Sequence, residues 1–139
     1  MSYPVGVTGG SIHFTMRIKL LAATPSALYV QFRDYDNPGT STFRGGPYIN
    51  ISSSRVLSAL GMTSVTLPAD TWVSLEFAFT MGAGAAKTYT LTVTPQGQSP
   101  TVRTNVFFQN MDFNILTSLY IRSWGPGTFL IDDVSLSTE

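Results

Sequence analysis

The sequence contains no cysteine, a single histidine and few charged residues, and each shortage excludes a class of chemistry. Without cysteine there is no disulfide and no thiol nucleophile, and one histidine makes a transition-metal site unfavourable. Charged residues are 12% of the chain, against about 25% in an average protein. Eight basic and eight acidic residues cancel, so the basic footprint of a nucleic-acid-binding protein is absent and no nucleic-acid partner is expected.

Long apolar runs are missing as well. No segment approaches the ~18 apolar residues of a membrane span, and no signal-peptide pattern opens the chain. Low charge with abundant Thr, Ser and Gly is typical of extracellular or cell-surface β-proteins. The 139 residues suffice for one domain with its own core, and a strand pattern begins almost at once. We therefore expect residues 1–139 to be a single domain excised from a larger multidomain protein.

What the sequence does have is an alternation of apolar and polar residues with a period of two, which predicts β-strands. Met1-Ser2-Tyr3-Pro4 leads into a glycine-rich turn, after which the alternation predicts eight or nine strands separated by Gly, Pro and Asn turns. They are expected at residues 12–20, 28–35, 48–52, 71–80, 88–94, 102–109, 116–124 and 129–137, with 55–61 as a strand or a helical turn. Most have one apolar face, which favours an all-β fold, either a two-sheet antiparallel sandwich or a barrel.

Four strand patterns together resemble those of the concanavalin A-like lectin/glucanase superfamily, which includes laminin-G-like modules and jelly rolls that serve as carbohydrate-binding modules. The patterns are Asp-x-Trp-Val-x-Leu-x-Phe at 70–77, Tyr-x-Leu-x-Val at 89–93, Leu-x-Ile at 119–121 and Ile-Asp-Asp-Val at 131–134. The resemblance implies a jelly-roll sandwich whose inner sheet often presents a concave surface. It also implies that Trp72 clamps the edge of the sandwich.

Catalytic carboxylates of the glucanase type are not found. Glycoside hydrolysis needs two carboxyl groups flanking the scissile bond, ~5–9 Å apart. Glu76 is the only glutamate on its strand, and the other glutamate of the chain is Glu139. We therefore expect no catalytic residue and no enzymatic activity.

A polysaccharide lyase is a less favoured alternative, because proton abstraction needs only a base and a group that neutralises charge. His13 is the one histidine and would be the base. The inward/outward alternation of each strand, its parity, allows several tyrosines and arginines to lie on the same side of the sandwich as His13. These are Arg17, Tyr29, Arg33, Tyr120 and Arg122.

Aromatic side chains on the polar faces of strands favour sugar binding, because a ring stacks on the C–H face of a sugar while adjacent polar groups bond its hydroxyls. The predicted ligand-binding residues are Tyr29, Arg33, Tyr120, Arg122 and Trp124, with Tyr35, Tyr48, Gln31 and Asn50 as further candidates. On one sheet these side chains would form a groove, whereas on two sheets they would be ordinary surface residues. For Trp124 the alternative is an anchor over Gly125-Pro126-Gly127.

Positive charge also points outward in this reading. Parity places Arg17, Lys19, Arg33 and Arg122 on the outward faces of their strands. Glu76 is the one acidic residue that is clearly predicted to point outward as well. A locally basic face would suit uronate or sulfate groups. The alternative is dispersed charge that keeps the protein soluble.

Asp132 and Asp133 interrupt the closing strand between apolar residues. Burying a carboxylate costs several kcal/mol unless it is paired. At least one of the two is therefore expected to be hydrogen-bonded within the fold or bound to Ca²⁺, the one cofactor considered, which takes six to eight oxygen ligands. A second group of oxygen ligands is Asp34-x-Asp36-Asn37.

These observations favour a non-catalytic, lectin-like carbohydrate-binding module of a secreted or cell-surface protein. Its partners would be a polysaccharide or glycan and other domains of its parent protein. The alternative is a structural or protein-interaction sandwich in a surface assembly, since threonine-rich strands and near-zero net charge also suit packing against other proteins.

Overall fold

The computed structural model describes residues 2–35 and 42–139, with side chains from residue 6 onward. Within these ranges the chain forms eleven strands. They are β1 (Ser2–Val7), β2 (Gly10–Leu20), β3 (Ala27–Tyr35), β4 (Phe43–Ile51), β5 (Val56–Ser58), β6 (Val65–Thr66), β7 (Trp72–Met81), β8 (Thr88–Pro95), β9 (Thr101–Phe107), β10 (Leu116–Trp124) and β11 (Phe129–Thr138). The described part of the chain has no helix that could span a bilayer.

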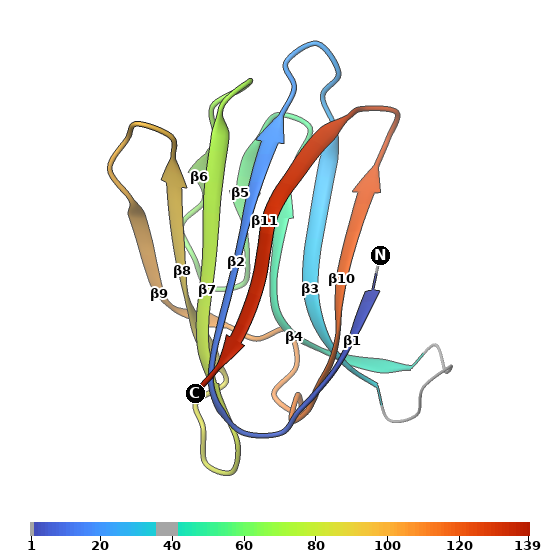
Figure 1. Cartoon of the computed structure of the whole chain (residues 1–139), viewed down its shortest axis with the longest axis vertical. Helices are drawn as coiled ribbons and strands as arrows, with labels where there is room; N and C mark the ends of the chain where they lie inside the picture. The colour runs from blue at the N-terminus through green and yellow to red at the C-terminus, as the bar shows by residue number, and fades with distance from the viewer. Residues whose placement is uncertain (1, 36–41) are drawn as a thin grey trace.

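The strands form two sheets that pack face to face (Figure 1). One has six strands in the order β1-β10-β3-β4-β5-β6, and the other has five in the order β11-β2-β7-β8-β9. Neighbouring strands are antiparallel throughout. The expected all-β, two-sheet antiparallel sandwich is therefore confirmed.

The core lies between the sheets and consists of the apolar faces that the alternation predicted. Ile12, Phe14, Met16 and Ile18 of β2 are buried against one another and against the neighbouring strands. At the centre the rings of Phe14, Phe32 and Phe77 meet edge to face, with centroids 5.2–5.8 Å apart. Edge-to-face contact between aromatic rings adds to the free energy gained by burial.

The alternation predicts eight or nine strands, whereas the residues that the structure describes form eleven. β1 lies before the first strand that the alternation predicts, in the segment that leads into the expected glycine-rich turn, and it pairs with β10 at the edge of the six-stranded sheet. Its Pro4 and Gly6 are turn residues by composition, but an edge strand tolerates proline because one side of its backbone is unpaired. β6 has two residues, too few for any alternation. The segment 55–61 contains a strand, β5.

β4 is longer than predicted because Gly45-Gly46-Pro47 forms a bulge within it. Gln31 of β3 lies opposite Tyr48 and Arg33 opposite Gly45, so β4 has one more residue than β3 in this step. A Cβ atom on Gly46 would lie 2.7 Å from the Phe113 ring, closer than any side chain permits. Glycine is required here because the backbone rests directly on an aromatic ring.

The two aspartates of β11 lie at a second bulge, where the register with β2 shifts between Asp132 and Ser135. Asp133 has a φ of 49°, and its N–H donates to the Asp132 carboxylate. Arg17 Nη2 donates to Asp132 Oδ2 at 2.9 Å, and Arg17 Nε forms an ion pair with Asp133 Oδ2 at 2.7 Å. The expectation that at least one of these aspartates is hydrogen-bonded within the fold is confirmed, although neither is buried.

The calcium site stays a prediction. The Asp132 and Asp133 oxygens face a guanidinium, and no group of three or more His, Asp or Glu residues in the described ranges is arranged to hold a metal ion. Asp34 belongs to a hydrogen-bond network described below, while Asp36 and Asn37 lie outside the described residues.

The bulge gives a prediction about protonation. The N–H of Asp133 and, second to it, Arg17 hold the pKa of Asp132 below its ordinary value. The stabilisation from these contacts is therefore present at neutral pH and lost as the pH falls through the lowered pKa. In an NMR titration Arg17→Gln should raise the pKa of Asp132 only partway, because the N–H remains. Lys19→Gln, which removes a charge from the same face, is the control. If the pKa of Asp132 returned fully to its ordinary value in Arg17→Gln, Arg17 and not the N–H of Asp133 would be the main cause of the lowered pKa, and this prediction would be wrong.

Candidate functional site

The outer face of the six-stranded sheet collects most of the polar and aromatic residues predicted to bind a ligand. The strand register places Arg122, Tyr29 and Asn50 in one row across β10, β3 and β4. The next row holds Tyr120, Gln31 and Tyr48. The single-sheet arrangement that the sequence left open is therefore the one that the structure shows.

Part of this face is hollowed into an open depression of about 610 Å³. The side chains of Tyr29 and Tyr48 lie in it with ring centroids 5.9 Å apart, tilted by 39°. Trp124, half exposed, lies at the end of β10 and completes the aromatic lining. The remaining lining residues are Asn50, Ser58, Ala59, Leu60, Gly61 and Gln109.

The hydroxyl group of Tyr29 is neutral at physiological pH. Burial, and next the neighbouring Tyr48, raise the pKa of Tyr29 to about 12. A neutral tyrosine hydroxyl can donate and accept a hydrogen bond, as the hydroxyls of a polar ligand require. With Asn50, Ser58 and Gln109 around the rings, the depression combines aromatic planes with hydrogen-bonding groups.

Two arginines on this face are stacked on aromatic rings. The guanidinium carbon of Arg122 lies 3.5 Å from the centroid of the Trp124 ring. That of Arg33 lies between two rings, 3.4 Å from Tyr120 and 3.9 Å from Phe43. Arg33 also donates from Nε to Gln31 and from Nη1 to the Tyr35 hydroxyl. Stacking fixes the planes of both guanidinium groups and directs their N–H groups along the surface.

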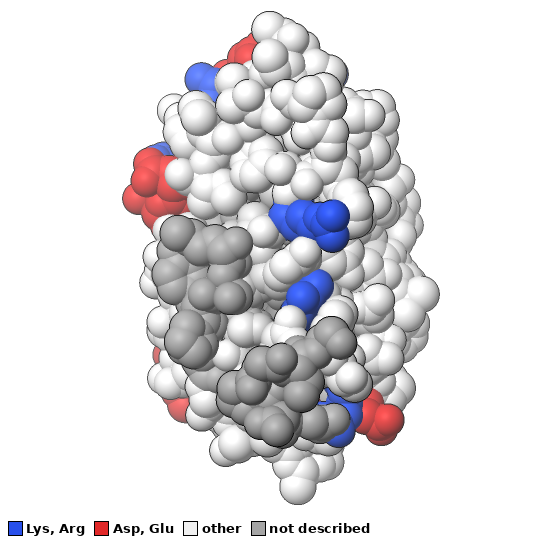
Figure 2. All heavy atoms as spheres, turned by 90° about the vertical axis from the view of Figure 1, so that its right-hand side faces the viewer, with Lys and Arg blue, Asp and Glu red and all other residues white. Residues whose placement is uncertain are grey.

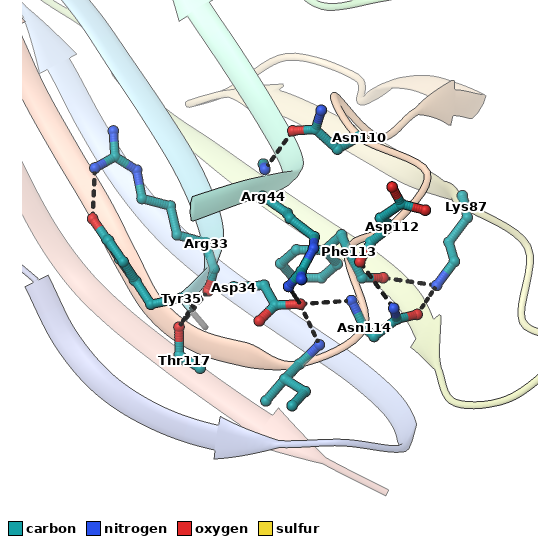
Figure 3. Close-up of polar contacts among 12 residues, drawn as sticks. Arg33, Asp34, Tyr35, Arg44, Lys87, Asn110, Asp112, Phe113, Asn114 and Thr117 are labelled. Atoms are coloured by element: carbon teal, nitrogen blue, oxygen red, sulfur yellow. Dashed lines mark hydrogen bonds and ion pairs between the residues drawn. The ribbon is translucent and has the colours of Figure 1, made fainter. Parts of the chain in front are cut away.

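One side of the depression is supplied by the connection between β9 and β10, which crosses from one sheet to the other. Gln109 and Asn110 donate backbone N–H groups to the carbonyls of Gly46 and Gly45. The Asn110 side chain accepts the N–H of Gly45 at 2.7 Å (Figure 3). The Gln109 side chain reaches the buried amide of Gln31. These bonds hold Gln109 beside β4.

The same connection is anchored by a buried carboxylate. Asp34 is 2% exposed, and its Oδ2 accepts the N–H groups of Asn114 and Ile115 at 3.0 and 3.2 Å (Figure 3). Arg44 lies 3.4 Å from the same oxygen. Lys87 holds the other side of the connection through Asn114 and the Phe113 carbonyl. Asp34, considered above as a metal ligand, therefore orders the segment next to the depression.

The predicted ligand-binding residues all lie on this face, but only some line the depression. Tyr29 and Trp124 line it, and Arg122 borders it through its stack on Trp124. Arg33 and Tyr120 lie farther along the sheet, stacked on each other. The lining residues that the sequence did not indicate are Ser58, Ala59, Leu60, Gly61 and Gln109. No local pattern marks them, because β5 and the β9–β10 connection reach the face only through tertiary pairing.

Two shared faces that the sequence left open are not formed. His13 and Arg17 lie on β2 of the five-stranded sheet, whereas Tyr29, Arg33, Tyr120 and Arg122 belong to the six-stranded sheet. The lyase arrangement around His13 is therefore not formed. The basic face of Arg17, Lys19, Arg33 and Arg122 is divided in the same way, since parity orders residues within a strand but does not assign strands to sheets.

The two tryptophans lie on opposite sheets. Trp72 is the first residue of β7. The guanidinium carbon of Arg17 lies 5.1 Å from the centroid of the Trp72 ring. Trp124 stacks with Arg122 and lines the depression, so its ring belongs to the face as well as to the start of the Gly125-Pro126-Gly127 turn.

The fold is similar to that of a galectin from Caenorhabditis elegans, seen in the crystal structure of LEC-6. The similarity has a TM-score of 0.55 with 9% sequence identity, and it covers 99% of this chain and 89% of that chain. No family model and no curated protein matches the sequence. At this identity the similarity establishes the jelly-roll fold alone.

Proposed function

We propose that this domain is a non-catalytic carbohydrate-binding module that binds a glycan in the depression on its six-stranded sheet. The observation that carries the proposal is the gathering of Tyr29, Tyr48 and Trp124 around one open depression. Rings that are held by a sheet offer stacking surface at little cost in conformational entropy.

The polar lining supports the same conclusion. Asn50 and Ser58 face each other across β4 and β5, and Gln109 is fixed by its bonds to β4. A sugar ring needs directed donors and acceptors for its hydroxyls next to an apolar surface for its C–H face. The fold that this chain shares with a galectin adds support, since a galectin is a lectin. We further propose that the domain works outside the cell or at its surface.

Glycan-array binding, followed by titration of the best ligand, tests the proposal. Trp124→Ala should weaken binding about tenfold or more, which corresponds to a loss of at least ~1.4 kcal/mol. Trp72→Ala is the matched control, because it makes the same change on the opposite sheet and should leave the affinity unchanged. Melting temperatures of both variants separate lost binding from lost folding.

Unchanged affinity in Trp124→Ala and in Tyr48→Ala would move the binding site away from this face. If the wild-type domain binds no glycan and light scattering finds a discrete oligomer, the alternative of a protein-interaction domain is favoured. The exposed side chains of Leu60 and Phe107 next to the depression would then be the first place to look for the interface.

A further inference from the structure

The charge on the outer face of the six-stranded sheet is of one sign. Arg33 and Arg122 lie on it, and none of the outward positions of β3, β4, β5 and β10 in the described chain carries a carboxylate. The described acids lie elsewhere, at Asp34, Asp70, Glu76, Asp112, Asp132, Asp133 and Glu139. Figure 2, which views the molecule from the side of β1 and β10, shows two basic groups in the middle with no acidic atoms beside them.

Arg122 has hydrogen-bond donors to spare. Its guanidinium stacks on Trp124, and no hydrogen bond or ion pair to another described residue engages it. Stacking uses the flat face of the group and leaves its in-plane N–H groups without a partner among the described residues. Two parallel N–H groups match the two oxygens of a carboxylate or sulfate, a geometry that a lysine lacks.

The position of Arg122 links this free guanidinium to the aromatic depression. It lies directly opposite Tyr29 in the strand register, and it is stacked on a ring that lines the depression. An acidic substituent of a sugar lying on Tyr29 and Trp124 would therefore fall within reach of Arg122.

Arg33 contributes in a different way. It is four residues from Tyr29 along β3, roughly 13 Å at the rise of an extended strand. Its Nε and Nη1 already donate to Gln31 and Tyr35. It therefore adds positive potential to the face, whereas Arg122 has the free donors.

We propose that this face selects acidic saccharides, with Arg122 binding the carboxylate or sulfate group of a sugar that stacks on Tyr29, Tyr48 and Trp124. This inference rests on the proposed function of the same depression. Carboxylate and sulfate share the charge and the paired oxygens that Arg122 can bind, so the experiment includes one polymer of each kind.

Affinity electrophoresis with two matched polymer pairs tests the inference. Polygalacturonate is compared with its methyl ester, and dextran sulfate with dextran, so that each pair differs in charge on one backbone. The wild-type domain should prefer at least one acidic polymer over its neutral counterpart. Arg122→Gln should weaken binding to that polymer about tenfold more than binding to the neutral one. Lys19→Gln, which removes the same charge from the opposite sheet, should leave binding unchanged.

The outcomes separate this inference from the proposed function. One contrary result is that Arg122→Gln leaves binding of the acidic polymer intact, and another is that Lys19→Gln weakens it just as much. Either result would show non-specific electrostatic attraction in place of a binding site at Arg122, and it would overturn the inference. Equal or better binding of the neutral polymers would overturn it too, and the lectin function would stand. If none of the four polymers is retarded while a neutral glycan binds on the array, the acidic preference is wrong. If no glycan binds at all, both proposals fail.

Discussion

Phe77→Ala should lower the free energy of unfolding by about 3–5 kcal/mol, the usual cost of removing a buried phenylalanine and leaving a cavity. Phe77 is 1% exposed, and its ring contacts those of Phe14, Phe32 and Tyr89 from both sheets. A domain of this size has a total stability of about 5–15 kcal/mol, so the variant should be close to unfolding at physiological temperature. Chemical denaturation of the wild type and the variant measures the loss, with one common slope of the free energy of unfolding against denaturant concentration fitted to both proteins.

Phe107→Ala is the matched control for this variant. Phe107 is 46% exposed and lies outside the core, so the same truncation should cost about 1 kcal/mol or less. A loss of under about 1 kcal/mol in Phe77→Ala would show that the inward register of β7 is wrong.

Asp34→Ala is the second substitution for which we expect a large effect, about 2–4 kcal/mol, because it removes a buried carboxylate that accepts two backbone N–H groups and pairs with the partly exposed guanidinium of Arg44. The change also leaves the N–H groups of Asn114 and Ile115 without their acceptor. The connection between β9 and β10 should loosen as a result. The backbone amide hydrogens of Asn114 and Ile115 should then exchange with solvent faster than they do in the wild-type protein, while those of the core strands should not.

Asp112→Ala tests whether this effect belongs to the buried carboxylate. Asp112 lies in the same connection but is exposed, so its removal should change stability by no more than about 0.5 kcal/mol. Asp34→Asn keeps an acceptor oxygen and should fall between the two. Unchanged amide exchange at 114 and 115 in Asp34→Ala would mean that Lys87 and the Asn110 contact suffice to hold the connection.

The regular part of the fold could be predicted because alternation is a local property. β2 and β7 each have five inward apolar residues in strict alternation, and both were placed with the correct face inward. β10 was placed with the observed bounds. The strands that were missed are those in which alternation is short or interrupted, as in β6 and in the Gly45-Gly46-Pro47 bulge of β4.

The site was predictable only in part for a different reason. Tyr29, Tyr48 and Asn50 could be selected because each faces outward on a clear strand. Which sheet a strand joins depends on the order of strands, and this order separated His13 and Arg17 from the tyrosines that parity had allowed beside them. Gln109 reaches the depression through hydrogen bonds to β4, a strand more than fifty positions away along the chain, and no local pattern encodes such a contact.

The bulge at Asp132 and Asp133 has a consequence for how copies of this domain behave beside one another. β11 is the last strand of its sheet, and an unpaired strand edge is a template onto which another chain can add. The left-handed backbone at Asp133 breaks the regular spacing of N–H and C=O groups along that edge. The other outer strands are interrupted too: β1 contains Pro4, β9 shifts register near Asn105, and β6 has two residues. Copies of the domain at high concentration are thereby protected against joining sheet to sheet into fibres.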